Sequence, residues 1–167
     1  MINVYIDSDV IVASEIRAEE NHIDSKKFMD YVLGQKSSEI RFFTSVFTFL
    51  ELASSMIRRT GSMDKTYSLL YRIKNTWKAS IYPLPPIRPE KFSSFTRLVD
   101  TLIETSIAFE TPSGDTIHAQ TVAANRIDIL TTWNKKHFAR LADKIGDLKI
   151  LDPRETMEEL NKIAQSK

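Results

Sequence analysis

The sequence contains no cysteine, which excludes disulfide bonds and metal sites built from thiolates. Only four glycines occur, and they form no glycine-rich phosphate loop. No stretch approaches the roughly 18 apolar residues that a membrane-spanning helix needs. The first residues lack the basic segment and the longer apolar segment of a signal peptide. We therefore expect a soluble protein of the cytoplasm.

An excess of either charge is also missing. The chain has 23 Lys and Arg residues against 22 Asp and Glu residues, so any binding to nucleic acid has to come from local basic patches. Its 167 residues and its 42% of hydrophobic residues are typical of one globular domain with a sizeable core. We expect residues 1–167 to form a single domain.

Short apolar segments alternate along the chain with longer segments whose apolar residues recur at helical spacing. This alternation predicts an α/β fold, in which helices cover both faces of a parallel sheet. The two helices between about 45 and 78 should form a helical hairpin, and Asp152 and Glu155 should cap the last helix as a reciprocal pair. Strands are expected at 4–6, 41–44, 81–84, 128–132 and 149–151. Helices are expected at 10–18, from 24 or 25 to 34, from a cap at 44 or 45 to about 60, at 63–78, from 89 to beyond 103, at 115–126, at 139–145 and after 152.

The stretch from Val4 to Ala13, VYIDSDVIVA, is the basis of the functional prediction. An apolar strand runs into Asp7, and a second apolar run follows at once. Ligands of parallel sheets bind at the carboxyl ends of the strands, and Asp7 lies at such an end. An acidic residue between apolar segments is costly unless something cationic meets it. The sequence therefore predicts further carboxylates and a metal ion beside Asp7.

Three other polar residues are predicted at the same edge of the sheet. Glu51 interrupts an apolar helix, Asp115 opens a helix, and Asn134 follows the fourth strand. Converging oxygen ligands without cysteine favour Mg²⁺ or Mn²⁺. Such an ion would hold a phosphodiester oxygen and lower the pKa of a bound water. We predict catalytic roles for Asp7, Glu51, Asp115 and Asn134, with Asp7, Asp115 and Glu51 as metal ligands.

Each of these four residues also has a simpler role open to it. Asp7 can cap the helix that follows, and Asp115 can be a favourable charge in the first turn of its helix. Glu51 can extend to water or pair with Arg58. Asn134 can be an ordinary turn residue. Their combination is more informative than any one of them, because strand ends and helix starts share one edge of a parallel sheet.

Five segments follow one another in the order YIDSDVIVA, FTFLELASS, GDTIHAQTVA, ILTTWNKKHF and KILDP. In this order they resemble the PIN-domain ribonucleases, in particular the VapC toxins of toxin–antitoxin pairs. The resemblance implies a three-layer α/β/α sandwich with a short central parallel sheet. It also implies cleavage of RNA with Mg²⁺ or Mn²⁺, a homodimer, and an antitoxin protein whose tail covers the acidic site. Asp7, Glu51 and Asp115 match three acidic positions of the family.

The fourth acidic position departs from the family pattern. Many members have an aspartate where this chain has Asn134, whose carbonyl oxygen accepts hydrogen bonds but brings no charge. This departure leaves open whether a second metal ion binds. Asp9 makes up part of the lost charge if the chain has already turned there, and we place Asp9 and His118 beside the metal ligands. A structural role is the alternative for His118.

RNA should pass over the same edge of the sheet. There, hydroxyl groups can donate to phosphates, and lysines can neutralise them and make binding salt-dependent. A solvated surface is the alternative for the lysines. The predicted substrate-binding residues are Ser8, Thr131, Thr132, Lys135 and Lys136.

Two other functions stay open. Asp7 and Asp9 resemble the nucleophile and the general acid of haloacid-dehalogenase-type phosphatases, although no second carboxylate lies near Asp115, where that class needs one. A PIN-like domain with a weakened site would instead bind RNA or protein without cleaving it, and Asn134 favours this hypothesis. The three carboxylates at Asp7, Glu51 and Asp115 argue against it, since they would repel one another without a metal.

Overall fold

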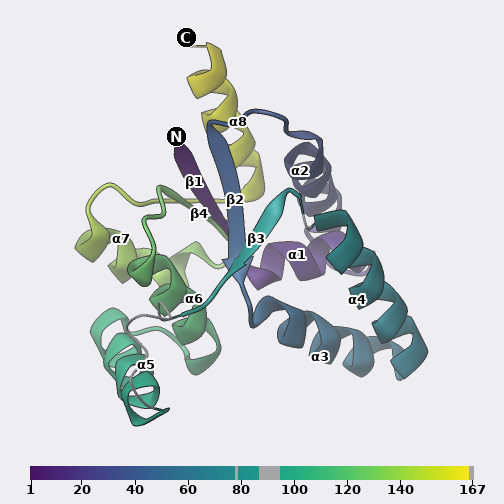
Figure 1. Ribbon diagram of the computed structural model, residues 1–167, viewed down its shortest axis with the longest axis horizontal. Helices are drawn as coiled ribbons and strands as arrows, with labels where there is room; N and C mark the ends of the chain where they lie inside the picture. The colour runs from purple at the N-terminus through teal and green to yellow at the C-terminus, as the bar shows by residue number, and fades with distance from the viewer. Residues whose placement is uncertain (78, 87–94, 166–167) are drawn as a thin grey trace.

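The computed structural model describes residues 1–77, 79–86 and 95–165, and a five-stranded sheet forms its centre (Figure 1). The strand order is β3-β2-β1-β4-β5, which puts β1 in the middle. Every neighbouring pair of strands is parallel. The strands are β1 (Ile2–Ile6), β2 (Ile40–Ser45), β3 (Ile81–Leu84), β4 (Ile129–Thr131) and β5 (Lys149–Leu151).

Helices connect these strands, because parallel neighbours need a crossover that returns the chain to the same end of the sheet. None of the helices in the described ranges has the length and apolar character required to cross a membrane. The helices are α1 (Ser8–Glu15), α2 (His22–Gly34), α3 (Thr48–Thr60), α4 (Met63–Trp77), α5 (Phe95–Phe109), α6 (Ser113–Ala124), the 3-10 helix η2 (Lys135–Phe138), α7 (Ala139–Ile145) and α8 (Pro153–Gln165).

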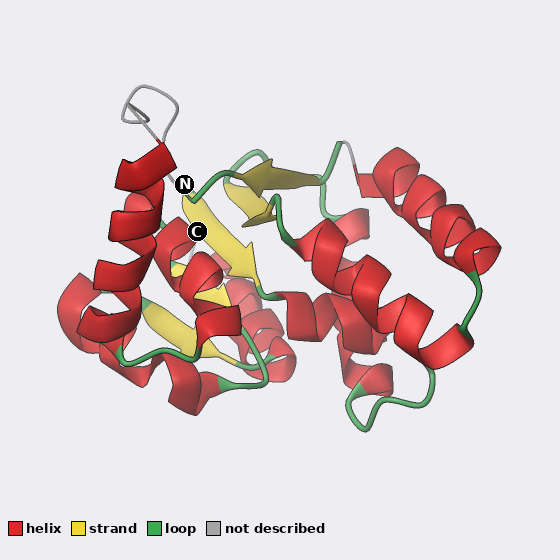
Figure 2. Cartoon of the chain, turned by 90° about the horizontal axis from the view of Figure 1, so that it is seen from below, coloured by secondary structure: helices red, strands yellow, loops and turns green. Residues whose placement is uncertain are grey.

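Alternate side chains of β1 point into two separate cores, as the pleat of a strand requires. Val4 and Ile6 pack with residues of α1, α2, α3, α4 and α8 on one face of the sheet. Tyr5 packs with residues of α6 and α7 on the other face. Figure 2 shows the strands between these two groups of helices. The fold is therefore a three-layer α/β/α sandwich with a short central parallel sheet, as predicted.

Several element bounds agree with the sequence prediction. Strands β3 and β5 and helix α7 begin and end at the predicted residues. The predicted cap of α8 is confirmed, since the N–H of Asp152 donates to Glu155 Oε2 at 2.8 Å and the N–H of Glu155 donates to Asp152 Oδ1 at 3.0 Å. The predicted helix from residue 89 is described only from Phe95 onward, and its earlier part lies outside the described residues.

Four predicted helix starts were wrong. One is that of α6, which begins at Ser113, two residues before the predicted start. Helix α1 begins at Ser8 rather than at residue 10, because the carboxylate of Asp7 accepts the N–H of Ser8 at 2.7 Å and caps the helix. Helix α2 begins at His22, two residues before the first predicted cap. Helix α3 begins at Thr48, because β2 continues to Ser45 and pairs there with β3.

Helices α3 and α4 follow one another and pack against each other. The break between them falls at Gly61, whose φ of 60° lies in the left-handed region that favours glycine. The N–H of Gly61 donates to the carbonyl oxygen of Ile57 at 2.9 Å and closes α3. Because α3 follows the end of β2 at Ser45, its first turn, with Glu51, lies at the carboxyl edge of the sheet, and the helix runs away from the sheet (Figure 1).

Candidate active site

The ends of β1 and β4 lie side by side at the centre of the sheet, with Ile6 opposite Thr131 in the register. The next residues are therefore neighbours too. The N–H of Asp7 donates to the carbonyl oxygen of Thr131 at 3.0 Å, and the hydroxyl of Thr132 donates to Asp7 Oδ2 at 2.8 Å. These bonds fix Asp7 at the carboxyl end of the central strand, where ligands of parallel sheets bind.

Asp7 is almost fully buried, with 2% of its surface exposed. Burial raises the pKa of its carboxyl group, the positive charge of His118 and the hydrogen bond from Thr132 act against this rise, and the charge of Asp115 adds to it. Asp7 also caps α1, so its predicted simpler role is real. Capping engages Oδ1 with the N–H of Ser8 and leaves the carboxylate facing His118.

His118 lies on α6 among the acidic residues and is also almost fully buried. Its Nδ1 is 2.6 Å from the hydroxyl of Tyr5 and 3.7 Å from Asp7 Oδ1, and its Nε2 is 2.7 Å from Glu51 Oε2. Burial alone would lower the pKa of His118, but the charges of Asp7 and Glu51 raise it to about 9. A pKa of about 9 favours the protonated imidazole at neutral pH.

Glu51 reaches the site from the first turn of α3, and 37% of its side chain is exposed. Burial tends to raise the pKa of Glu51, but the hydrogen bond and the charge of His118 hold it below its ordinary value. The alternative pairing of Glu51 with Arg58 is absent from the ion pairs of the described residues, where Arg58 donates to Ser55 Oγ at 3.3 Å instead. Glu51 is thus directed toward His118 rather than along its own helix.

Asp115 enters from the first turn of α6, three residues before His118. Its Oδ2 lies 2.8 Å from Nδ1 of His137 on η2. The negative charge of Asp115 contributes to the raised pKa values of both Asp7 and His118. Helix α6 therefore brings an acid and a histidine to the same edge of the sheet. The contact with His137 was not predicted, because nothing local in the sequence links positions 22 residues apart.

Asp9 and Asn134 both form hydrogen bonds with the hydroxyl of Thr132. Since α1 begins at Ser8, the chain has already turned at Asp9, and Asp9 Oδ2 accepts the N–H of Trp133 at 3.0 Å and the hydroxyl of Thr132 at 3.2 Å. The N–H of Asn134 donates to the same hydroxyl at 3.0 Å. Within the described residues, Asp9 Oδ1 is buried without a hydrogen-bond partner. Burial and the charge of Asp7 raise the pKa of Asp9 well above its ordinary value.

The predicted substrate-binding residues are placed differently from one another. Thr131 is fully buried, and its hydroxyl lies 3.0 Å from that of Thr156 on α8, away from the acidic residues. Lys135 Nζ donates to Glu155 at 2.8 Å, so its charge is already paired. Lys136 is exposed, and Ser8 lines a groove beside Glu51. Ser8 and Lys136 are therefore the better placed of these residues to meet a ligand.

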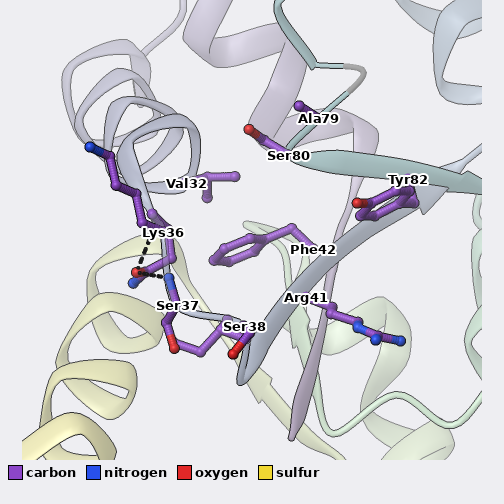
Figure 3. Close-up of a pocket in the computed structure, with 11 residues that line it drawn as sticks. Val32, Lys36, Ser37, Ser38, Arg41, Phe42, Ala79, Ser80 and Tyr82 are labelled. Carbon is purple, nitrogen blue, oxygen red and sulfur yellow. Dashed lines mark hydrogen bonds between the residues drawn. The ribbon is translucent and has the colours of Figure 1, made fainter.

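A different pocket, of about 440 Å³, lies at the opposite end of the sheet, where β2 and β3 begin (Figure 3). Phe42 points into it, whereas the charged ends of Lys36 and Arg41 extend away from it. Gln35 accepts the N–H groups of Lys36 and Ser37 at 2.9 and 3.0 Å and so closes one side of the pocket. This pocket is separate from the acidic residues and shares no side chain with them.

The donor chemistry of Asp7, Glu51 and Asp115 suits a hard divalent cation. Among the described residues, however, no three acidic or histidine side chains have the convergence of a finished metal site. Glu51 and Asp115 instead contact the imidazole rings of His118 and His137. Each ring occupies a position beside its carboxylate that a metal ion would otherwise take. Within the described residues, Asp9 Oδ1 is the buried side-chain oxygen that has no partner, and burial raises the pKa of Asp7.

Comparisons with known proteins identify a fold and no family. No protein-family model matches the chain, and no curated protein sequence matches it. Among solved structures, one chain of VapBC-1 from nontypeable Haemophilus influenzae matches with a TM-score of 0.56 over 92% of this chain and 99% of that chain. The two chains share one fold. Their sequences are only 16% identical, so the match shows a shared architecture and gives no information about activity.

Proposed function

We propose that the protein is a metal-dependent endoribonuclease and acts as the toxin of a toxin–antitoxin pair. The observation that carries this proposal is the position of Asp7, buried at the carboxyl end of the central strand with His118 and Thr132 against it. The shared fold with a chain of VapBC-1 supports it, because that structure belongs to a toxin–antitoxin system by name. The ordered motifs of the sequence support it independently.

Oxygen atoms of Asp7, Asp115 and Glu51 are proposed to hold one Mg²⁺ or Mn²⁺ ion. When bound, such an ion polarises a phosphodiester oxygen and lowers the pKa of a water molecule, which prepares that water for attack. Glu51 is partly exposed and can turn from His118, whereas Asp7 is fixed by two hydrogen bonds. We therefore assign the rigid part of the site to Asp7 and the adjustable part to Glu51.

The remaining residues position these ligands. The hydroxyl of Thr132 orients Asp7 and accepts the N–H of Asn134, so one side chain links the metal ligand to the loop after β4. His118 holds Glu51 and offsets the negative charge of Asp7. Asn134 offers an uncharged amide that can orient a water or a phosphate oxygen. Ser8 and Lys136 are proposed to contact RNA.

An antitoxin and a second copy of the chain are the proposed protein partners. Large apolar side chains on the α3–α4 hairpin are exposed, among them Leu50, Tyr67 and Tyr71 at 63%, 64% and 74%. Apolar surface of this kind is typical of a face that meets another protein. Leu50 adjoins Glu51, so a bound antitoxin segment on this surface would also cover the acidic residues.

The phosphatase hypothesis is less well supported by the geometry. A general acid at Asp9 would have to present its proton to a leaving group. In the structure, Asp9 Oδ2 is engaged by Trp133 and Thr132, and Oδ1 is buried. Oδ2 is therefore occupied by the residues that follow β4, and Oδ1 is closed off from solvent.

The proposal is tested with three substrates in Mg²⁺, in Mn²⁺ and in EDTA. They are single-stranded RNA, structured RNA and p-nitrophenyl phosphate as a phosphomonoester. Cleavage of RNA that stops in EDTA and returns with Mg²⁺ is the expected result. Hydrolysis of the phosphomonoester alone would support the phosphatase instead. Tight RNA binding without cleavage in any metal would support the binding module.

A further inference from the structure

A groove of about 440 Å³ opens beside the acidic residues and lies between α1 and α3. Leu50, Ser54 and Arg58 are four residues apart on α3, which places them along one face of the helix. Glu51 lies at one end of this face and Arg58 at the other, about 10 Å away along the helix axis at 1.5 Å per residue. The residues that line the groove are Ser8, Asp9, Val12, Leu50, Glu51, Ser54, Ser55 and Arg58.

Arg58 differs from two nearby arginines, Arg59 and Arg72, in its ion pairing. Arg59 pairs with Glu19, and Arg72 pairs with Glu15. Arg58 is exposed, donates to the hydroxyl of Ser55, and takes part in none of the ion pairs formed within the described part of the chain. Among the described residues, the groove therefore ends at a guanidinium group that pairs with no carboxylate.

The lining of the groove varies along its length. At the Glu51 end it is acidic and, under the proposed function, holds a metal ion with a phosphate. In the middle it offers the hydroxyls of Ser54 and Ser55 on one side and the exposed apolar side chain of Leu50 on the other. At the far end Arg58 suits a second phosphate, since a guanidinium binds phosphate oxygens with two parallel hydrogen bonds.

We propose that this groove binds a single strand of RNA that leaves the acidic site along α3, with Arg58 on the phosphate next to the one that is cleaved. This inference rests on the proposed function and extends it, because it adds a path along α3 to the contact proposed for Lys136 after β4. The groove has the volume of a small-ligand pocket and accommodates unpaired nucleotides rather than a double helix. Leu50 provides apolar surface for a base.

The test compares Arg58→Ala, Arg58→Lys and the matched control Arg59→Ala, all in an Asp7→Asn background that blocks cleavage. Affinity for a fluorescein-labelled ten-nucleotide single-stranded RNA, and for the same sequence in a duplex, is measured by anisotropy in Mg²⁺ at several salt concentrations. Arg58→Ala should weaken binding to the single strand about tenfold and reduce the salt slope by about 0.7, the value for one lost phosphate contact. Arg58→Lys should retain most of the slope, and Arg59→Ala should change the affinity less than twofold.

A second measurement uses the active chain with Asp7 intact. There, Arg58→Ala should raise KM about tenfold and leave kcat nearly unchanged, because Arg58 holds a part of the substrate that does not react. Unchanged affinity and KM in Arg58→Ala, or equal binding of duplex and single strand, would overturn the inference. If the wild-type chain cleaves no RNA, the proposed function is wrong. If the chain cleaves RNA but Arg58→Ala leaves affinity and KM unchanged, only the proposed binding of RNA in the groove is wrong.

Discussion

Nε2 of His118 lies 2.7 Å from Oε2 of Glu51, and its other ring nitrogen lies 3.7 Å from Oδ1 of Asp7. One buried imidazole thus joins two acids that come from different elements, at the point where we propose a metal ion. The charges of these acids raise the pKa of His118 to about 9 from its ordinary value of 6.5. The free energy of unfolding of the metal-free protein should therefore fall as the pH rises.

Because the pKa of His118 is higher in the folded than in the unfolded chain, protonation of His118 stabilises the fold. This contribution, about 3 kcal/mol at 1.36 kcal/mol per pKa unit, is complete below pH 6.5 and is lost as the pH rises through 9. Urea unfolding in EDTA should show this fall between pH 6.5 and 9.5. His118→Gln should flatten the curve, and an equally steep fall in His118→Gln would contradict the assignment.

Thr132 and Thr131 are adjacent, are both fully buried and have different partners. Thr132→Val removes the hydroxyl that donates to Asp7, and we expect a loss of about 1–2 kcal/mol of stability together with a large loss of RNA cleavage. Thr131→Val removes a hydroxyl that bonds only Thr156 among the described side chains, so its stability loss should be similar and its activity close to wild type. Equal activity losses in both variants would mean that Thr132 acts only through the fold.

Asp9 has a buried oxygen without a partner in the described structure, and it shares the hydroxyl of Thr132 with Asp7. Burial and the charge of Asp7 raise the pKa of Asp9, which means that the ionised form of Asp9 is disfavoured in the folded chain. Asp9 therefore lowers the stability of the fold once the pH is high enough for it to ionise. Asp9→Asn keeps an oxygen for the N–H of Trp133 and should stabilise the metal-free protein at pH 8 by about 1 kcal/mol or more. Urea unfolding tests this, with the exposed Asp143→Asn as control. Destabilisation by Asp9→Asn would show that the negative charge itself is needed for folding.

Asn134 is proposed to orient a water or a phosphate oxygen at the metal site, at the position where many PIN-domain ribonucleases have an aspartate. Its N–H donates to Thr132, which holds it at the same edge of the sheet as Asp7. Asn134→Asp should raise the affinity for Mn²⁺ about tenfold, because cation affinity increases with the number of charged ligands. Calorimetric titration with MnCl₂ measures this, and Asn161→Asp adds the same charge at an exposed position of α8 as the control. If both variants change the affinity equally, Asn134 does not belong to the metal site.

The order of strands and helices was predictable because it depends on local patterns. Apolar segments of the sequence determine where β1 and β4 lie. Because β1 ends directly before Asp7, this residue lies at the carboxyl edge of the sheet independently of the other contacts in the fold. The start of α1 was not predictable in the same way. The sequence Asp7-Ser8-Asp9 offers three caps, and the observed choice depends on Thr132 and Trp133, which hold Asp9 from the loop after β4.

The contacts between the acidic residues and the histidines could not be predicted from the sequence either, because they join distant positions of the chain. Glu51 and His118 are 67 positions apart and meet only because α3 and α6 begin at the same edge of the sheet. Sequence analysis placed His118 beside the metal ligands from its position after Asp115, but it gave no reason for a contact with Glu51. Likewise, Lys135 looks available in the sequence, and only the packing of α8 shows that Glu155 already pairs with it.

The central claim is that Asp7 and a divalent cation together cleave RNA, and Asp7→Asn tests it most directly. The variant removes the charge and keeps the oxygen that accepts from Thr132, but its amide nitrogen replaces the oxygen that accepts the N–H of Ser8. Urea unfolding is therefore measured alongside the assay to show that the variant is folded under the assay conditions. We predict at least about a hundredfold loss of Mg²⁺-dependent cleavage, equivalent to about 2.7 kcal/mol, and no loss in the exposed control Asp147→Asn. Cleavage that persists in Asp7→Asn, or that persists in EDTA with wild type, would contradict the account.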